Sequence, residues 1–194
     1  GWKLPEFAHV SVLRNPDKSK LSKRKNPVWT SEYLEKGILK EALLNYLSLM
    51  GWSHPEEKEI FTLEEYIKVF DIKDVQTTAP VFDPVKLEWM NGEYIRNLKF
   101  EILNLKIQEY IGNDYNKNII EKTIPLVRER LKKLSDYLPL CEFLFSPPAT
   151  YEIDLKKYAD LLRNVHDALL NIKEWKALTI GEAMGEIAKK LGIK

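Results

Sequence analysis

The sequence is poor in the residues that form disulfides and metal sites. It has 194 residues but only one cysteine, Cys141, and three histidines, His9, His54 and His166. A single cysteine excludes an intramolecular disulfide framework and is typical of a reducing compartment, so we expect a cytoplasmic protein with Cys141 in its core. One cysteine and three histidines far apart in the chain do not have the spacing of metal ligands, so we expect no metal site.

Long apolar runs are missing as well. No run reaches the ~18 residues that a membrane-spanning helix requires, and residues 1–5 lack the layout of a signal peptide. Hydrophobic residues still make up 44% of the chain and charged residues 30%. We therefore expect a chain that buries a core, folds as one or two domains and has no membrane partner.

An excess of one charge occurs in only one segment. The net charge is +1, but residues 14–25 carry six basic side chains against one acidic residue, Asp17. The local charge of +5 leaves −4 for the rest of the chain. A basic segment on a mildly acidic body indicates either a site for a polyanion or a solvated basic turn, and charge alone favours neither.

Hydrophobic periodicity predicts a mainly α-helical chain. A short strand over residues 7–13 and a turn at residues 15–17 are expected before the basic segment. The rest of the chain is predicted to form helices at residues 27–37, 38–50, 62 onward, 84–92, 93–111, 117–135, 136–145, 152–171 and 180–191. We predict capping boxes at Thr62 and at Thr179, because each has a glutamate three residues later.

The predicted fold class is mainly α, a bundle or superhelix of short helices with a small β remnant at the N-terminus. One or two strands are too few for a free-standing sheet. We therefore expect the apolar side chains of the N-terminal segment to be exposed, namely Trp2, Phe7, Val10 and Val12.

The basic segment contains a sequence motif. Residues 20–24 read Lys-Leu-Ser-Lys-Arg and lie between the predicted turn and the first predicted helix. They resemble the Lys-Met-Ser-Lys-Ser signature of class I aminoacyl-tRNA synthetases, in the form usual for glutamyl enzymes. Blocks that resemble bacterial-type glutamyl-tRNA synthetases flank the motif in the same order, at residues 5–9, 37–47, 50–53, 59–65 and 81–95. The resemblance is strong over residues 5–96 and continues more weakly to the end.

This resemblance implies three domains and an enzymatic parent. Residues 1–26 would be the tail of a catalytic domain with the signature loop, residues 27–96 a stem-contact helical domain, and residues 97–194 an anticodon-binding helical domain truncated at its C-terminus. The parent would join glutamate to tRNA with ATP and Mg²⁺. The implied partners are glutamate tRNA, ATP and glutamate, and we expect a monomer.

The second ATP signature of that family, His-Ile-Gly-His, does not occur in these residues. In the family it belongs to the nucleotide-binding fold, which also holds glutamate. We therefore expect the isolated chain to be inactive, with ATP and glutamate bound through the missing N-terminal domain.

The resemblance also implies roles within the signature. Amino-acid activation expels pyrophosphate, so negative charge accumulates on the leaving group and preorganised positive charge stabilises it. Lys23 matches the second lysine of the signature and is expected to touch the triphosphate, and Lys20 is its expected catalytic companion. The ATP-binding residues implied by the motif are Lys20, Leu21, Ser22, Lys23 and Arg24.

Later helices of the family approach the anticodon. The candidates for tRNA binding are Lys122, Arg130 and Lys133, whose spacing roughly allows one helical face. Arg130 aligns best with a family arginine near the anticodon, and a planar, forked guanidinium suits base edges better than lysine does. Solvated surface charge is the competing interpretation for each of the three.

Two other functions stay open. One is a non-catalytic tRNA-binding helical module, which differs from the first hypothesis in having no catalytic parent. A glutaminyl-tRNA synthetase is less favoured, because the anticodon region of that enzyme is typically a β-barrel and this chain is predicted to be helical. Whether the parent also charges glutamine tRNA is not decided by these residues.

Overall fold

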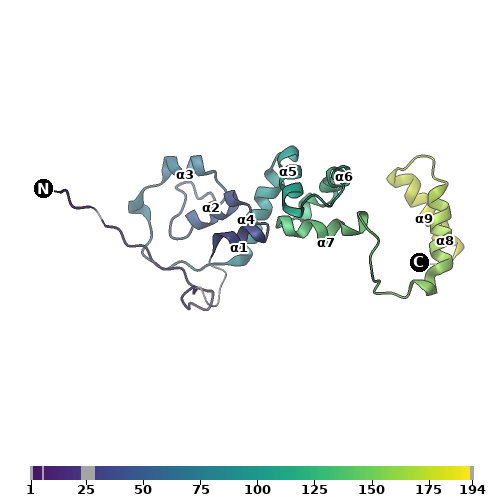
Figure 1. The fold of residues 1–194 in the computed structure, drawn as a ribbon, viewed down its shortest axis with the longest axis horizontal. Helices are drawn as coiled ribbons and strands as arrows, with labels where there is room; N and C mark the ends of the chain where they lie inside the picture. The colour runs from purple at the N-terminus through teal and green to yellow at the C-terminus, as the bar shows by residue number, and fades with distance from the viewer. Residues whose placement is uncertain (1, 6, 23–28, 193–194) are drawn as a thin grey trace. The chain divides into compact units, whose positions relative to one another are not determined.

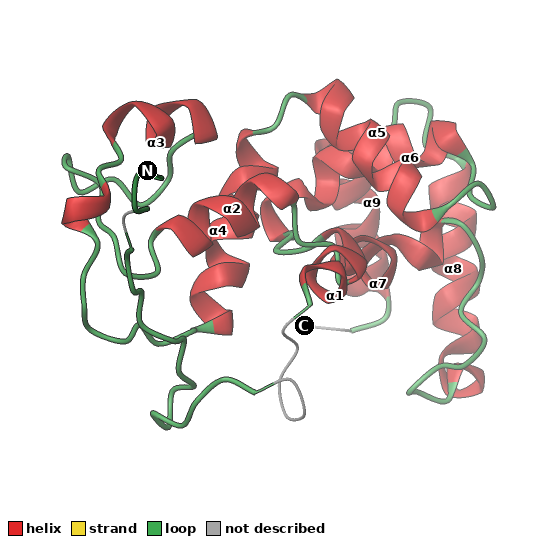
Figure 2. Ribbon diagram, turned by 60° about the vertical axis from the view of Figure 1, so that its left-hand side comes forward, coloured by secondary structure: helices red, strands yellow, loops and turns green. Residues whose placement is uncertain are grey.

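The computed structural model describes residues 2–5, 7–22 and 29–192 (Figure 1). The chain divides into two compact units, Gly1–Pro147 and Pro148–Lys194. The prediction of a mainly helical chain is confirmed for this part, and Figure 2 shows helices joined by loops. None of the described helices is both long and apolar enough to cross a membrane.

Short helices build the first unit. Its α-helices are α1 (Thr30–Glu35), α2 (Lys40–Ser48), α3 (Leu63–Val69), α4 (Pro84–Asn97), α5 (Phe100–Ile111), α6 (Lys117–Val127) and α7 (Tyr137–Cys141). Its 3₁₀ turns are η1 (Ile72–Asp74), η2 (Arg128–Arg130), η3 (Leu134–Asp136) and η4 (Glu142–Leu144). Isolated helices below ~12–15 residues are marginal in water, so packing must supply most of their stability.

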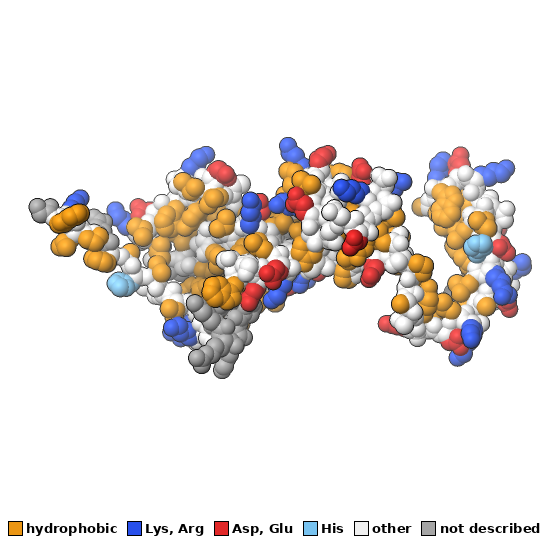
Figure 3. All heavy atoms as spheres, in the orientation of Figure 1, with side chains coloured by type: hydrophobic (Ala, Val, Ile, Leu, Met, Phe, Trp, Pro, Cys, Tyr) orange, Lys and Arg blue, Asp and Glu red, His pale blue; other side chains and the backbone are white. Residues whose placement is uncertain are grey.

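The strand predicted at residues 7–13 is wrong. The described residues contain no sheet, only isolated bridges that pair Arg14 with Lys20 and with Val81. A strand needs a neighbouring backbone along its whole length, and this segment meets one only around Arg14, whose N–H donates to the Pro80 carbonyl at 2.9 Å. The four apolar side chains expected to be exposed are so, namely Trp2, Phe7, Val10 and Val12, and Figure 3 shows apolar side chains along the N-terminal segment. Leu13, next to Arg14, is half-buried against the core.

Helix α4 starts where the sequence predicts and runs past its predicted end. Asp83 caps it by accepting a hydrogen bond from the Val85 amide at 2.8 Å. The predicted end at Gly92 is wrong, because α4 continues to Asn97. Gly92 is buried, and a Cβ atom there would lie 3.1 Å from Arg96 Nη1 and 3.4 Å from the Leu131 carbonyl oxygen. This glycine lies inside the helix and does not terminate it.

The helices predicted at residues 93–111 and 117–135 are each interrupted. The first divides at Leu98, whose backbone is extended, and α5 begins after it. The second gives way at Arg128 to the 3₁₀ turns η2 and η3. Arg128 also connects the two interruptions, because its Nη2 donates to the carbonyls of Arg96 and Leu98. Carbonyls left without helical partners at the end of α4 are thereby satisfied.

The two predicted capping boxes have different outcomes. The box at Thr62 is confirmed. The Thr62 amide donates to Glu65 Oε2 at 2.7 Å, and Thr62 Oγ1 accepts from the Glu65 amide at 3.1 Å. The box at Thr179 is wrong, because α9 already begins at Ala177. Thr179 Oγ1 instead accepts from the Lys176 amide at 3.2 Å, one turn inside the helix.

Two hydrophobic clusters form the core of the first unit. The larger comprises Leu39, Ala42, Ile95, Leu103, Ile107, Ile120, Ile124, Val127, Leu131, Leu134, Tyr137 and Cys141. The smaller comprises Ile38, Leu43, Tyr46, Phe82, Leu87 and Met90. Helices α2 and α4 pack together and contribute to both clusters. The prediction that Cys141 lies in the core is confirmed, and burial raises the pKa of its thiol.

The second unit is a pair of helices. Helices α8 (Ala159–Leu170) and α9 (Ala177–Lys190) pack against each other, and the 3₁₀ turn η5 (Leu155–Tyr158) precedes them. Among the described residues of this unit, no side chain is fully buried. Its apolar residues are therefore only half covered by the two helices themselves.

Candidate functional site

The turn that leads to Lys20 is held by its own hydrogen bonds. The Asn15 amide donates to the Ser19 carbonyl and the Lys18 amide to the Asn15 carbonyl, each at 2.8 Å. The Ser19 amide donates to Asp17 Oδ1 at 2.9 Å. Lys18 adopts a φ of +65°, in the left-handed region that most residues avoid. These local bonds fix the backbone before the signature begins.

Arg14 attaches the turn to the body of the first unit. Its carbonyl accepts a hydrogen bond from the Phe82 amide at 2.8 Å, and Phe82 is buried in the smaller cluster. Its guanidinium donates back to the Lys18 carbonyl at 3.2 Å. The Arg14 side chain therefore stabilises the turn through this hydrogen bond.

Three of the five predicted ATP-binding residues lie in the described part of the chain. The Lys20 side chain is exposed, whereas Leu21 and Ser22 are half-buried. Leu21 packs against the smaller cluster and so anchors the start of the signature. Lys23 and Arg24 lie outside the described residues, and their roles stay predictions.

A pocket of about 260 Å³ lies beside the turn. It is lined by apolar side chains of the turn, α1 and α4 and by three charged side chains, Lys36, Glu88 and Lys133. Pockets for small molecules usually measure ~300–1,000 Å³. We therefore interpret this pocket as the joint between the turn, α1 and α4.

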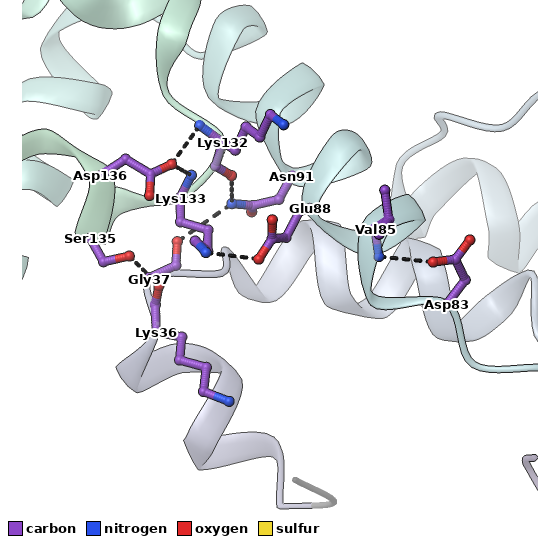
Figure 4. A network of polar contacts seen from close by, with 10 residues as sticks. All are labelled: Lys36, Gly37, Asp83, Val85, Glu88, Asn91, Lys132, Lys133, Ser135 and Asp136. Carbon is purple, nitrogen blue, oxygen red and sulfur yellow. Dashed lines mark hydrogen bonds and ion pairs between the residues drawn. The ribbon is translucent and has the colours of Figure 1, made fainter. Parts of the chain in front are cut away.

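One ion pair beside this pocket involves a predicted tRNA contact. Lys133 Nζ lies 2.7 Å from Glu88 Oε1, and both side chains are more than half covered (Figure 4). The hydrogen bond to Glu88 raises the pKa of the Lys133 ammonium. The charge of Lys133 is therefore already partly neutralised within the protein.

A fully buried asparagine lies next to this ion pair on α4. Asn91 Oδ1 accepts from the Leu39 amide at 2.8 Å. Its Nδ2 donates to the Lys132 carbonyl at 2.6 Å and to the Gly37 carbonyl at 3.5 Å (Figure 4). The side chain thus connects the start of α2 with the segment between η2 and η3. Buried polar groups are costly unless paired, and Asn91 pairs backbone groups from both segments.

The three predicted tRNA contacts occupy different settings. Lys122 is exposed on α6, Arg130 is exposed in η2, and Lys133 is ion-paired. The idea that they share one helical face is wrong, because α6 ends at Val127. Their contacts with tRNA stay predictions.

Asn91 and Gly37 are not among the site residues predicted from the sequence. Asn91 stands between Leu87, Met90 and Ile95 on an apolar helix face, and this misfit was the available signal. For metal binding, the described residues hold no group of three or more histidine, cysteine, aspartate or glutamate side chains in suitable proximity.

Comparisons with known protein families match both halves of the chain. Residues 1–89 match the family described as tRNA synthetases class I (E and Q), catalytic domain. Residues 95–194 match the family described as anticodon binding domain. The turn and the pocket described above lie largely in the first match, and Lys122, Arg130 and Lys133 lie in the second.

Individual relatives extend these matches. A glutamate–tRNA ligase of Stutzerimonas stutzeri is 37% identical over the whole chain, and one of Pseudoalteromonas translucida is 47% identical over 78% of it. The chain spans 40% and 30% of these two relatives. The crystal structure of a glutamate tRNA ligase from Elizabethkingia meningosepticum in complex with its amino acid is similar over the whole chain, with a TM-score of 0.80 and 28% identity, and the match covers 44% of that chain.

Proposed function

The chain belongs to the glutamate–tRNA ligase family, where it corresponds to the end of the class I catalytic domain and to the anticodon-binding domain, and we propose that its parent enzyme attaches glutamate to tRNA with ATP. In this proposal residues 20–24 supply positive charge to the triphosphate of ATP, which brings Mg²⁺ as its counterion. Residues beyond 95 supply a surface for glutamate tRNA.

The turn before the signature is the observation that carries the proposal for ATP. Local hydrogen bonds fix residues 15–19, Arg14 attaches the turn to the core, and Lys20 is exposed at its end. Lys20 therefore ends a support held by hydrogen bonds and keeps its side chain exposed. Charge placed in advance at a leaving group accelerates a reaction because no reorganisation is needed when the group departs.

The proposal is tested with Lys23→Ala in the full-length parent. We expect ATP–pyrophosphate exchange to fall by roughly 10²–10³-fold, the usual effect of removing one donor to transition-state charge. Lys18→Gly is the matched control, because it removes one positive charge from the same segment and relieves the left-handed backbone of that residue. Near-normal exchange in Lys23→Ala would remove Lys23 from its role.

The same experiment separates the enzyme from the non-catalytic module. If the parent binds glutamate tRNA but shows no ATP–pyrophosphate exchange with any substrate set, the module is the better interpretation. Equal losses in Lys23→Ala and Lys18→Gly would mean that total charge matters and the position of Lys23 does not.

A further inference from the structure

The short helix α1 depends on contacts from elsewhere in the chain. It has six residues, none of them buried, and its N-cap residue Trp29 makes no side-chain capping bond. A helix of this length is not stable by itself in water. It is the first described helix after the signature segment, and its Tyr33 packs against the same cluster as Leu21, so the source of its order is important.

Three successive carbonyls at the end of α1 receive hydrogen bonds from distant residues. The Glu35 carbonyl accepts from the Tyr110 hydroxyl at 2.7 Å. The Lys36 carbonyl accepts from Ser135 Oγ at 2.9 Å (Figure 4). The next carbonyl, that of Gly37, accepts from the Leu134 amide at 3.0 Å. The last carbonyls of a helix have no partners within it, so these donors act as its C-terminal cap.

All three donors belong to the part of the chain that matches the anticodon-binding family, residues 95–194. They come from α5 and from η3, which contact each other. The cap of α1 is therefore supplied by the part of the chain that follows α4. Asn91 reinforces the junction by bonding the Leu39 amide and the Lys132 carbonyl.

The backbone of Gly37 makes this junction specific. Its φ is +81°, and a Cβ atom at this position would lie 2.7 Å from the backbone nitrogens of Leu134 and Ser135. Only glycine fits both the left-handed conformation and the close approach. The end of α1 and the start of η3 can therefore not shift independently of each other.

We propose that Tyr110 and Ser135 are positioning residues for the signature segment. By capping the end of α1, the anticodon-binding domain holds the helix whose Tyr33 packs, like Leu21 of the signature, against the smaller cluster and lines the same pocket. It thereby sets the surface on which the start of the signature is anchored. Coupling of this kind is reciprocal, so a ligand that moves η3 alters α1 and a ligand that orders α1 alters η3. The consequence for ATP rests on the function proposed above, whereas the cap itself does not.

The first test measures hydrogen exchange of the α1 amides in the 194-residue chain. Tyr110→Phe and Ser135→Ala each remove one hydroxyl donor, and we expect exchange at residues 33–38 to rise roughly threefold to tenfold for each and more in the double variant. Tyr137→Phe and Ser48→Ala are the matched controls. Each removes a hydroxyl with its own hydrogen bond, to Thr123 and to the Leu44 carbonyl, and neither touches α1.

The second test measures ATP–pyrophosphate exchange in the full-length parent. We expect Tyr110→Phe and Ser135→Ala to raise the KM for ATP about threefold to tenfold while the KM for glutamate stays near its normal value. The control variants should change neither. General loss of stability would lower the amount of active enzyme and would not move one KM selectively.

The two tests fail in distinguishable ways. Unchanged exchange of the α1 amides in both single variants overturns the inference, whatever the enzyme does. Faster exchange of α1 with a KM for ATP equal to that of the controls retains the cap but overturns its role for the signature. Failure of the proposed function is seen separately, as normal activity of Lys23→Ala. Tyr110→Phe keeps its aromatic ring, so it remains informative if the double variant does not fold.

Discussion

The backbone nitrogen of Ser135 lies 2.7 Å from the position that a Cβ atom on Gly37 would occupy. The two residues are far apart in sequence, and their backbones are in contact where α1 ends and η3 begins. The Ser135 hydroxyl completes the contact by donating to the Lys36 carbonyl. Substitutions at this contact should therefore cost more than the same substitutions at a glycine in open space.

Gly37→Ala should strongly destabilise the chain. The left-handed φ alone costs about 1–2 kcal/mol for a residue with a Cβ atom, and the forced separation from Leu134 and Ser135 adds roughly 1–3 kcal/mol. Gly51→Ala is the control in the same unit, because Gly51 has a φ of +95° and the nearest atom to its would-be Cβ is the Gln76 carbonyl oxygen at 3.9 Å. Urea unfolding should show a larger loss for Gly37→Ala. Equal losses would mean that the contact at Gly37 relaxes freely.

Asn91→Ala should lower the free energy of unfolding by about 2–4 kcal/mol. The substitution leaves the buried Leu39 amide and the Lys132 carbonyl without their partner, and each unpaired buried group costs about 1–3 kcal/mol. Asn97→Ala is the control on the same helix, since the Asn97 side chain is exposed and bonds the Glu93 carbonyl within that helix. A loss no greater than that of Asn97→Ala would show that water replaces Asn91 at no cost.

Local signals in the sequence were sufficient for the helical class and for several helix starts. Thr62 and Asp83 cap their helices as predicted, because a cap depends on residues within one turn. The strand at residues 7–13 failed for the opposite reason, since pairing depends on a distant backbone that reaches only Arg14. The end predicted at Gly92 is wrong because a glycine that ends a helix and a glycine inside a helix look alike in sequence.

The junction at α1 could not be predicted from spacing. Asn91 bonds residues that are 52 and 41 positions away, and the Tyr110 hydroxyl bonds a carbonyl 75 positions away. No periodic pattern contains such pairs. The resemblance in the sequence singled out the segment at residues 20–24, because a motif is carried by neighbouring residues, and the role of that segment stays a prediction. The turn that leads to Lys20 became visible only in three dimensions.

The ion pair of Lys133 and Glu88 should contribute a pH-dependent part of the stability. In the folded chain the pKa of the Lys133 ammonium is raised above its ordinary value of 10.5. The stabilisation is therefore complete below pH 10.5 and is lost as the pH rises through the folded pKa. Because both side chains are partly exposed, we expect only about 0.5–1 kcal/mol near neutral pH.

The measurement compares the free energy of unfolding of the unmodified chain with that of Lys133→Met between pH 8 and 11.5. The difference should be constant at the lower end and should shrink above about pH 10.5. Taking the difference cancels the tyrosines that titrate in both proteins. A difference that stays constant to pH 11.5 would show that packing of the lysine stem, and not its charge, stabilises the junction.

Arg130→Ala should weaken binding of glutamate tRNA without affecting stability. Arg130 is exposed in η2, and removing one phosphate or base contact should reduce affinity by about 1–3 kcal/mol and lower the salt dependence of log K by about one unit. Arg128→Ala provides the contrast two residues away, because Arg128 donates to the carbonyls of Arg96 and Leu98. Arg128→Ala should lower the free energy of unfolding, whereas Arg130→Ala should not. Binding of tRNA to Arg130→Ala with an unchanged affinity and salt slope would show that Arg130 is ordinary surface charge.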